Sequence, residues 1–113
     1  MDQLIEIRNY TLKPGTQAHF DLLMQQQSLP LLRAAGTDVV CARASLHAPL
    51  AYVLIRAYPG LAARSASQDA FYTSAAWLSG PCAAVMACID SYSTVVLDAS
   101  AATIDGLRAR SRA

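Results

Sequence analysis

The sequence has few charged residues for a small protein. Asp, Glu, Lys and Arg together make up 15% of the 113 residues, and the formal net charge is only +1. The one run of like charge is the alternating set Arg108, Arg110 and Arg112, so the sequence lacks the basic surface that nucleic-acid binding requires. Low charge density in a small domain indicates that one of its faces is covered by another subunit. An alanine-rich composition is the alternative explanation.

The sequence also lacks the features of disulfide-rich, metal-binding and membrane proteins. Its three cysteines, Cys41, Cys82 and Cys88, have no C-x-x-C spacing and no nearby histidine pair, which predicts free thiols in a reducing compartment and no metal site. No apolar run reaches the ~18 residues that a membrane-spanning helix needs. The first ten residues show no signal-peptide pattern. We therefore expect a cytoplasmic protein with no membrane partner.

No glycine-rich loop suited to phosphate binding is present, because the five glycines are scattered at turns. The two histidines, His19 and His47, have no third ligand at metal spacing, and a lone histidine is more often structural or solvated than a haem ligand. The cysteines have no evident basic partner that would activate them as nucleophiles. We therefore expect no cofactor.

What the sequence does contain is a regular succession of strand and helix patterns. Alternating hydrophobicity predicts strands over residues 4–12, 38–47, 50–58 and 90–98. Helical spacing begins after the turn at Lys13–Gly15, and Pro30 predicts a kink or break at about Ser28. Two further helices are predicted over residues 61–77 and 81–89. Residues 1–98 then form one domain, and residues 99–113 are expected to be an exposed tail.

The order of these elements is that of a ferredoxin-like α+β domain, β-α-β-β-α-β, with a four-stranded antiparallel sheet and helices on one face. The apolar side of the strands is expected to lie under the helices; it comprises Ile5, Ile7, Val40, Ala42, Leu46, Val53, Ile55 and Val95. The other side is polar and aromatic; it comprises Glu6, Arg8, Tyr10, Arg43, His47, Tyr52, Arg56, Tyr58 and Tyr92, with several apolar residues. We expect this second side to pack against a second copy of the chain.

Three stretches resemble the NIPSNAP family. The segment IEIRNYTLKPG, residues 5–15, is similar to that family's opening strand and K-P-G turn. The segments LPLLRAAG, residues 29–36, and YVLIRAYPGLAAR, residues 52–64, are similar to the end of its first helix and to its third strand. Trp77 falls where a tryptophan often follows in the family. The resemblance implies a dimeric α+β barrel in which two subunits set their sheets face to face. It implies no particular activity.

The charged residues of the polar side have two open interpretations. Glu6 and Arg8 lie two residues apart on one strand, and Arg43 and Arg56 are predicted to reach the same interior. They form either an ion-pair network across the dimer interface or an anchor for a substrate carboxylate or enolate. In the second case Glu6 acts as a base, with His47 as the other catalytic candidate.

The ligand-binding candidates on this side are Arg8, Tyr10, Arg43, Tyr52, Arg56, Tyr58 and Tyr92. Tyrosines suit an aromatic ligand and a subunit interface equally well. Three functions therefore remain open. The chain binds a small organic ligand, catalyses cofactor-free oxygenation or isomerisation of a phenolic or enolisable compound, or forms a dimer with no ligand.

Overall fold

The computed structural model describes residues 3–111 and contains one four-stranded antiparallel sheet in the order β2-β3-β1-β4. The strands are β1 (Gln3–Leu12), β2 (Asp38–Ala44), β3 (Ala51–Tyr58) and β4 (Ile89–Ala99). β1 is central, and it pairs with β3 on one side and with β4 on the other. This order and the β-α-β-β-α-β succession confirm the ferredoxin-like α+β fold predicted from the sequence.

The first crossover is one continuous helical run. It comprises α1 (Gln17–Leu23), the π-helical turn η1 (Met24–Ser28) and α2 (Leu29–Ala34). The kink or break predicted at about Ser28 takes the form of a π-turn: the chain stays helical, and η1 ends at Ser28, just before Pro30. A π-turn spaces the backbone hydrogen bonds differently from an α-helix. The helical run can therefore continue although Pro30 has no backbone N–H to donate. Gly36 ends the run with a φ of 87°, in the left-handed region that favours glycine.

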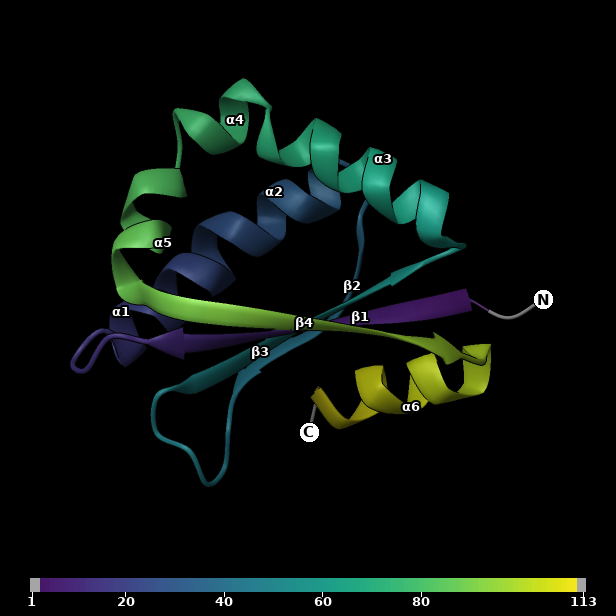
Figure 1. The fold of residues 1–113 in the computed structure, drawn as a ribbon, viewed down its shortest axis with the longest axis horizontal. Helices are drawn as coiled ribbons and strands as arrows, with labels where there is room; N and C mark the ends of the chain where they lie inside the picture. Colours follow the sequence, from purple (N-terminus) through teal and green to yellow (C-terminus); the bar gives the residue numbers. More distant parts are fainter. Residues whose placement is uncertain (1–2, 112–113) are drawn as a thin grey trace.

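The second crossover is divided into three short helices. They are α3 (Leu61–Tyr72), α4 (Ala75–Leu78) and α5 (Cys82–Cys88). Together with α1, η1 and α2 they lie over one face of the sheet (Figure 1). The main core forms between this layer and the sheet, around Phe20, Leu54 and Trp77.

The segment expected to be an exposed tail is instead a helix, α6 (Ala101–Ser111), on the opposite face of the sheet (Figure 1). Ile104 is only 2% exposed and belongs to a second core cluster with Ile5 and Ile55. Arg108 donates hydrogen bonds to the backbone carbonyl of Val39 at 3.1 Å and to the Asp38 carboxylate at 2.8 Å. The other two alternating arginines, Arg110 and Arg112, lie outside the described side chains. Helices therefore cover both faces of the sheet, not one.

The two faces of the sheet are exchanged relative to the expectation from the sequence. Tyr10, Tyr52 and Leu54 lie under α1–α5, whereas Ile5 and Ile55 face α6. Alternation separates two sets of side chains but does not say which set the helices cover. The helices cover the polar-aromatic set because its charged members find partners within that layer.

A bulge in β2 also changes the face of Arg43. Val39 is opposite Arg56 and Cys41 is opposite Ile55, so Val40 is an extra residue and the alternation shifts. Arg43 is therefore opposite Val53, on the α6 side, and it is exposed. The prediction that Arg43 and Arg56 reach one interior is wrong.

The position of Ile104 provides a test of the α6 contact. We expect Ile104→Ala to lower the free energy of unfolding by about 2–5 kcal/mol, because it deletes a buried side chain. The exposed Ala102→Ser serves as the control and should change it by less than about 0.5 kcal/mol. Urea unfolding of both variants checks this. If both variants change the free energy of unfolding by less than about 0.5 kcal/mol, Ile104 is not a buried contact and the segment is an exposed tail.

Candidate functional site

The site is built around one buried carboxylate, Glu6, in the central strand β1. Its side chain is fully buried. One oxygen, Oε1, accepts a hydrogen bond from Arg56 of β3, and the other, Oε2, accepts from Arg64 and Gln68 of α3. Arg8 approaches Oε1 less closely, at 3.5 Å. The carboxylate therefore joins two strands to the helix above them.

These contacts keep Glu6 ionised. Burial alone would raise the pKa of Glu6, but the charge of Arg56 and the hydrogen bonds from Gln68, Arg56 and Arg64 outweigh it and hold the pKa below its usual value of 4.5. A carboxylate with both oxygens occupied and a lowered pKa is a poor proton acceptor. The network also lies inside one subunit, so the prediction of an ion-pair network across the dimer interface is wrong in its location.

Helix α3 contributes a polar stripe to the buried layer. Arg64, Gln68 and Tyr72 recur at every fourth position and therefore lie on one side of the helix. The Tyr72 hydroxyl accepts a hydrogen bond from Arg56 Nη1 at 2.9 Å. None of these three residues was among the site candidates from the sequence. Their spacing was the available signal, and it was hidden because the stripe facing the sheet is polar rather than apolar.

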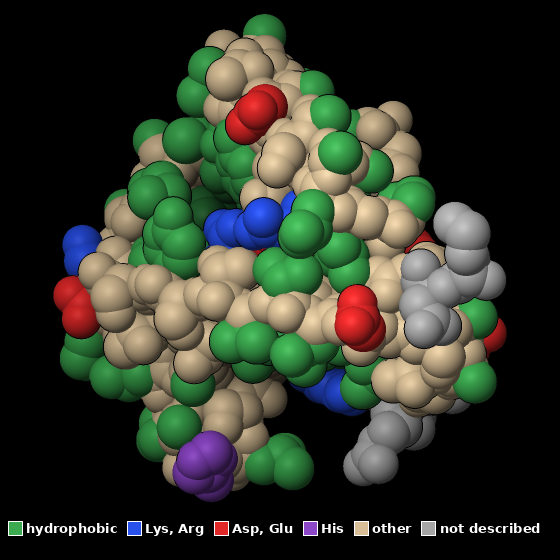
Figure 2. Space-filling model, turned by 45° about the vertical axis from the view of Figure 1, so that its right-hand side comes forward, with side chains coloured by type: hydrophobic (Ala, Val, Ile, Leu, Met, Phe, Trp, Pro, Cys, Tyr) green, Lys and Arg blue, Asp and Glu red, His purple; other side chains and the backbone are tan. Residues whose placement is uncertain are grey.

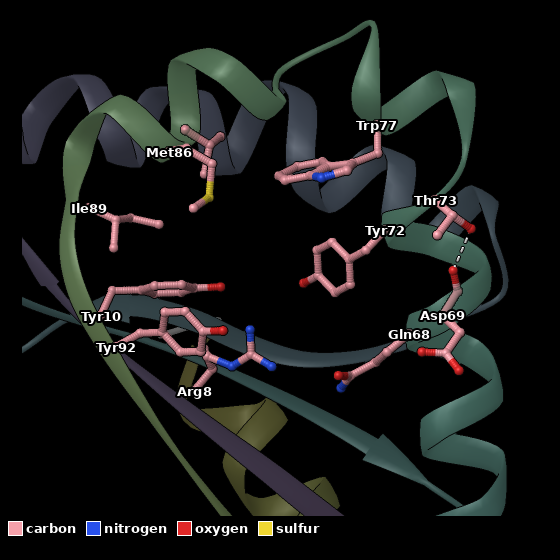
Figure 3. Close-up of a pocket in the computed structure, with 11 residues that line it drawn as sticks. Arg8, Tyr10, Gln68, Asp69, Tyr72, Thr73, Trp77, Met86, Ile89 and Tyr92 are labelled. Carbon is pink, nitrogen blue, oxygen red and sulfur yellow. Dashed lines mark hydrogen bonds between the residues drawn. The ribbon is translucent and has the colours of Figure 1, made fainter.

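A cavity of about 330 Å³ lies beside this network, between α3–α5 and the β1–β4 half of the sheet. Its lining residues are Arg8, Tyr10, Gln68, Asp69, Tyr72, Thr73, Trp77, Val85, Met86, Ile89 and Tyr92. Figure 2 shows a hollow in which arginine or lysine atoms reach the surface between hydrophobic side chains. In Figure 3 the Arg8 guanidinium and the hydroxyls of Tyr10 and Tyr72 point into the same space.

Three predicted ligand-binding residues line this cavity: Arg8, Tyr10 and Tyr92. The Tyr92 ring lies against the Arg8 guanidinium, with its centroid 4.8 Å from Cζ. Burial is the main cause that raises the pKa of the Tyr10 phenol above its usual value of 10.0. Tyr10 therefore stays protonated and presents a hydrogen-bond donor.

The other candidates do not line the cavity. Tyr52 donates a hydrogen bond to Asp21 Oδ1 at 2.6 Å, which ties β3 to α1. Tyr58 and Arg56 are buried beside Glu6 and Gln68. His47 is exposed in the loop after β2, where its Nδ1 lies 3.2 Å from the Ser45 hydroxyl.

Among the residues that the structure describes, no three or more His, Cys, Asp or Glu side chains gather in a way that could hold a metal ion. Within residues 3–111, no helix combines the length and the hydropathy needed to cross a bilayer.

Comparison with solved structures identifies the fold. An uncharacterized NIPSNAP domain protein from Burkholderia xenovorans superposes with a TM-score of 0.76, at 18% identity, over 87% of this chain and 95% of the other. A NIPSNAP family protein from Agrobacterium tumefaciens gives a TM-score of 0.80, at 14% identity, over 90% of each chain. This chain has the fold of NIPSNAP proteins.

The NIPSNAP fold extends to other proteins. A proposed antibiotic biosynthesis monooxygenase from Bordetella bronchiseptica superposes with a TM-score of 0.66, at 21% identity, over 86% of this chain and 96% of the other. No family model and no curated protein matches the sequence. The resemblance seen in IEIRNYTLKPG is thus confirmed at the level of the NIPSNAP fold, and the activity must be argued from the site.

The lowered pKa of Glu6 makes a prediction about stability and pH. Because the folded-state pKa lies below the unfolded value, the contribution of Glu6 is complete above pH ~4.5 and is lost as the pH falls through the folded pKa. We expect Glu6→Gln to cost about 3–5 kcal/mol at pH 7, since it leaves buried arginine charge uncompensated. The difference from wild type should shrink below pH 4.5, as measured by urea unfolding between pH 7 and 3.

The exposed Asp90→Asn is the matched control, and it should show no such difference. A Glu6→Gln variant as stable as wild type at pH 7 would mean that the carboxylate does not hold the layer together.

Proposed function

We propose that this chain is a NIPSNAP-like protein that binds a small organic ligand in the cavity beneath α3–α5 and acts as a homodimer in the cytoplasm. The cavity supports the ligand, since it combines aromatic walls with Arg8, whose Nε has no hydrogen-bond partner. The three cysteines, which are all free thiols, support the reducing compartment.

The size and lining of the cavity support a small, flat ligand. Ligand pockets in proteins usually have volumes of ~300–1,000 Å³, so a cavity of about 330 Å³ is at the lower end of that range. Tyr72 and Trp77 form one wall, with ring centroids 5.5 Å apart and planes at 85°. Tyr10 and Tyr92 form the opposite wall, with centroids 6.3 Å apart. Walls of this kind bind an aromatic ring through its faces and edges.

An enzyme is the second candidate, because proteins from Bordetella bronchiseptica and Nitrosomonas europaea with the same fold are proposed antibiotic biosynthesis monooxygenases. Cofactor-free oxygenation or isomerisation needs a base at the substrate. Neither Glu6 nor His47 lines the cavity, and the carboxylate that does, Asp69, is exposed on α3. The geometry therefore favours binding without turnover.

The homodimer is supported by the sheet face opposite the cavity. The cluster around Ile104 of α6 includes residues of β2 and β3 and also Ile5 of β1 and Ala99 of β4, but the middle of β4 is left open. Val95 and Leu97 of β4 are 50% and 48% exposed there, opposite Ile7 and Ile5 of β1. A second copy seated face to face would cover this apolar area. The interface is then the apolar side of the sheet, not the polar-aromatic side expected from the sequence.

The ligand proposal is tested by filling the cavity. We expect Met86→Phe, at the cavity wall, to abolish the shifts in melting temperature that small aromatic fragments cause in the wild-type protein. The matched control is Leu78→Phe, an equally exposed apolar position outside the cavity. A fragment screen by differential scanning fluorimetry measures both. If no fragment stabilises the wild type at millimolar concentration, the ligand proposal is wrong.

The dimer proposal is tested by charging the open sheet face. We expect light scattering to give twice the 12.0 kDa chain mass for the wild type and the single chain mass for Leu97→Asp. A carboxylate buried at an apolar interface without a partner is strongly unfavourable. Leu61→Asp, at an exposed leucine on α3, should leave the dimer intact. A wild-type monomer at micromolar concentration contradicts the proposal.

A further inference from the structure

Arg8, Tyr10 and Tyr72 contribute hydrogen-bond donors to the cavity, beside the acceptor oxygens of Gln68 and Asp69. The Nε of Arg8 is buried without a hydrogen-bond partner. The Tyr10 hydroxyl makes no hydrogen bond to any described residue, and the pKa raised by burial keeps its proton in place. The Tyr72 oxygen already accepts from Arg56, so its own proton is free to be donated. A ligand that binds the Arg8 guanidinium, which points into the cavity, and the two phenol groups must present acceptors (Figure 3).

The charges around the cavity are also unbalanced. Arg8, Arg56 and Arg64 share a single buried carboxylate, Glu6, which leaves two positive charges in excess. Glu6 makes its close contacts with Arg56 and Arg64, so Arg8 is the arginine whose charge is least compensated. Asp69 at the cavity wall is exposed and offsets one charge at most. Arg8 is only 12% exposed, and a cation so buried is costly without an opposite charge.

We propose that the ligand is a small aromatic carboxylate whose carboxylate group is bound by Arg8, Tyr10 and Tyr72. The planar guanidinium of Arg8 matches a carboxylate, and the two phenol groups donate from either side. The aromatic part of the ligand lies toward Trp77 and Met86, the apolar end of the cavity (Figure 3). This assignment rests on the proposed function, ligand binding in the cavity. It adds the charge of the ligand and the residues that bind the charged group.

Arg56 acts in this site as a positioning residue. It is fully buried between Glu6 and Tyr72, and it donates to both. Because its hydrogen bond occupies the Tyr72 oxygen, the Tyr72 proton is directed away from Arg56. A chain of hydrogen bonds that starts at a cation also strengthens the donor at its end. Glu6 and Arg56 thus prepare Tyr72 without touching the ligand.

The test uses two probes of the same shape, 3-phenylpropionate and 3-phenylpropionamide. Trp77 is the single tryptophan of the chain and lines the cavity, so its fluorescence reports occupancy. We expect the carboxylate to bind the wild type about tenfold or more tightly than the amide, because hydrogen bonds to a charged group are stronger than those to a neutral one. Calorimetry under the same conditions confirms the affinities.

The variants assign the preference to its residues. Arg8→Gln should reduce the affinity for the carboxylate to that for the amide, and Tyr72→Phe should weaken the carboxylate alone by about fivefold, the loss of one hydrogen bond. Arg43→Gln, an exposed arginine on the other face of the sheet, is the matched control and should change neither affinity. Arg8→Lys keeps the positive charge and should retain part of the preference for the carboxylate over the amide. This variant tests the role of Arg8 if Arg8→Gln does not fold.

The outcomes separate this proposal from the one on which it rests. If the amide binds the wild type as tightly as the carboxylate, the cavity binds ligands but the anion assignment is wrong. A preference that survives in Arg8→Gln would also overturn the assignment to Arg8. If neither probe binds, both the carboxylate and the ligand cavity are contradicted.

Discussion

The structure depends on the burial of one carboxylate, that of Glu6. Its two oxygens connect β1 to Arg56 of β3 and to Arg64 and Gln68 of α3. Apolar packing between α3 and the sheet is limited, because Phe71 is the only residue of that helix that is fully buried. The ion pairs therefore determine where α3 lies over the sheet. The position of α3 in turn sets Tyr72 against Arg56 and leaves the cavity beside them.

Much of the fold could be predicted from local patterns. Period-two alternation and the turns at Lys13–Gly15 and Pro59–Gly60 gave the four strands, and their order gave the ferredoxin-like arrangement. The covered face could not be predicted in this way, since a period of two is the same for either orientation. Nor could the bulge at Val40, which moves Arg43 away from Glu6, because it depends on pairing with β3. Segment 101–111 has no clear apolar stripe, so its docking through Ile104 was not visible either.

The strand half of the candidate site was predicted from the sequence, and the helical half was not. Arg8, Tyr10 and Tyr92 are on strands, where neighbouring residues on one face are easily paired, and all three line the cavity. The helical half of the site comes from α3–α5, which are rich in serine and alanine, and α3 turns polar side chains toward the sheet. Reading α3 by the recurrence of Arg64, Gln68 and Tyr72, rather than by hydrophobicity, would have found the helical half of the site.

The most direct test of this account is a double-mutant cycle between Glu6 and Arg64, which join the sheet to α3. The free energies of unfolding of wild type, Glu6→Gln, Arg64→Gln and the double variant give the coupling between the two side chains. If the ion pair holds α3 in place, the coupling should lie at about 1–3 kcal/mol at pH 7 and should fall as Glu6 is protonated. Additive effects, within about 0.5 kcal/mol, would contradict the account.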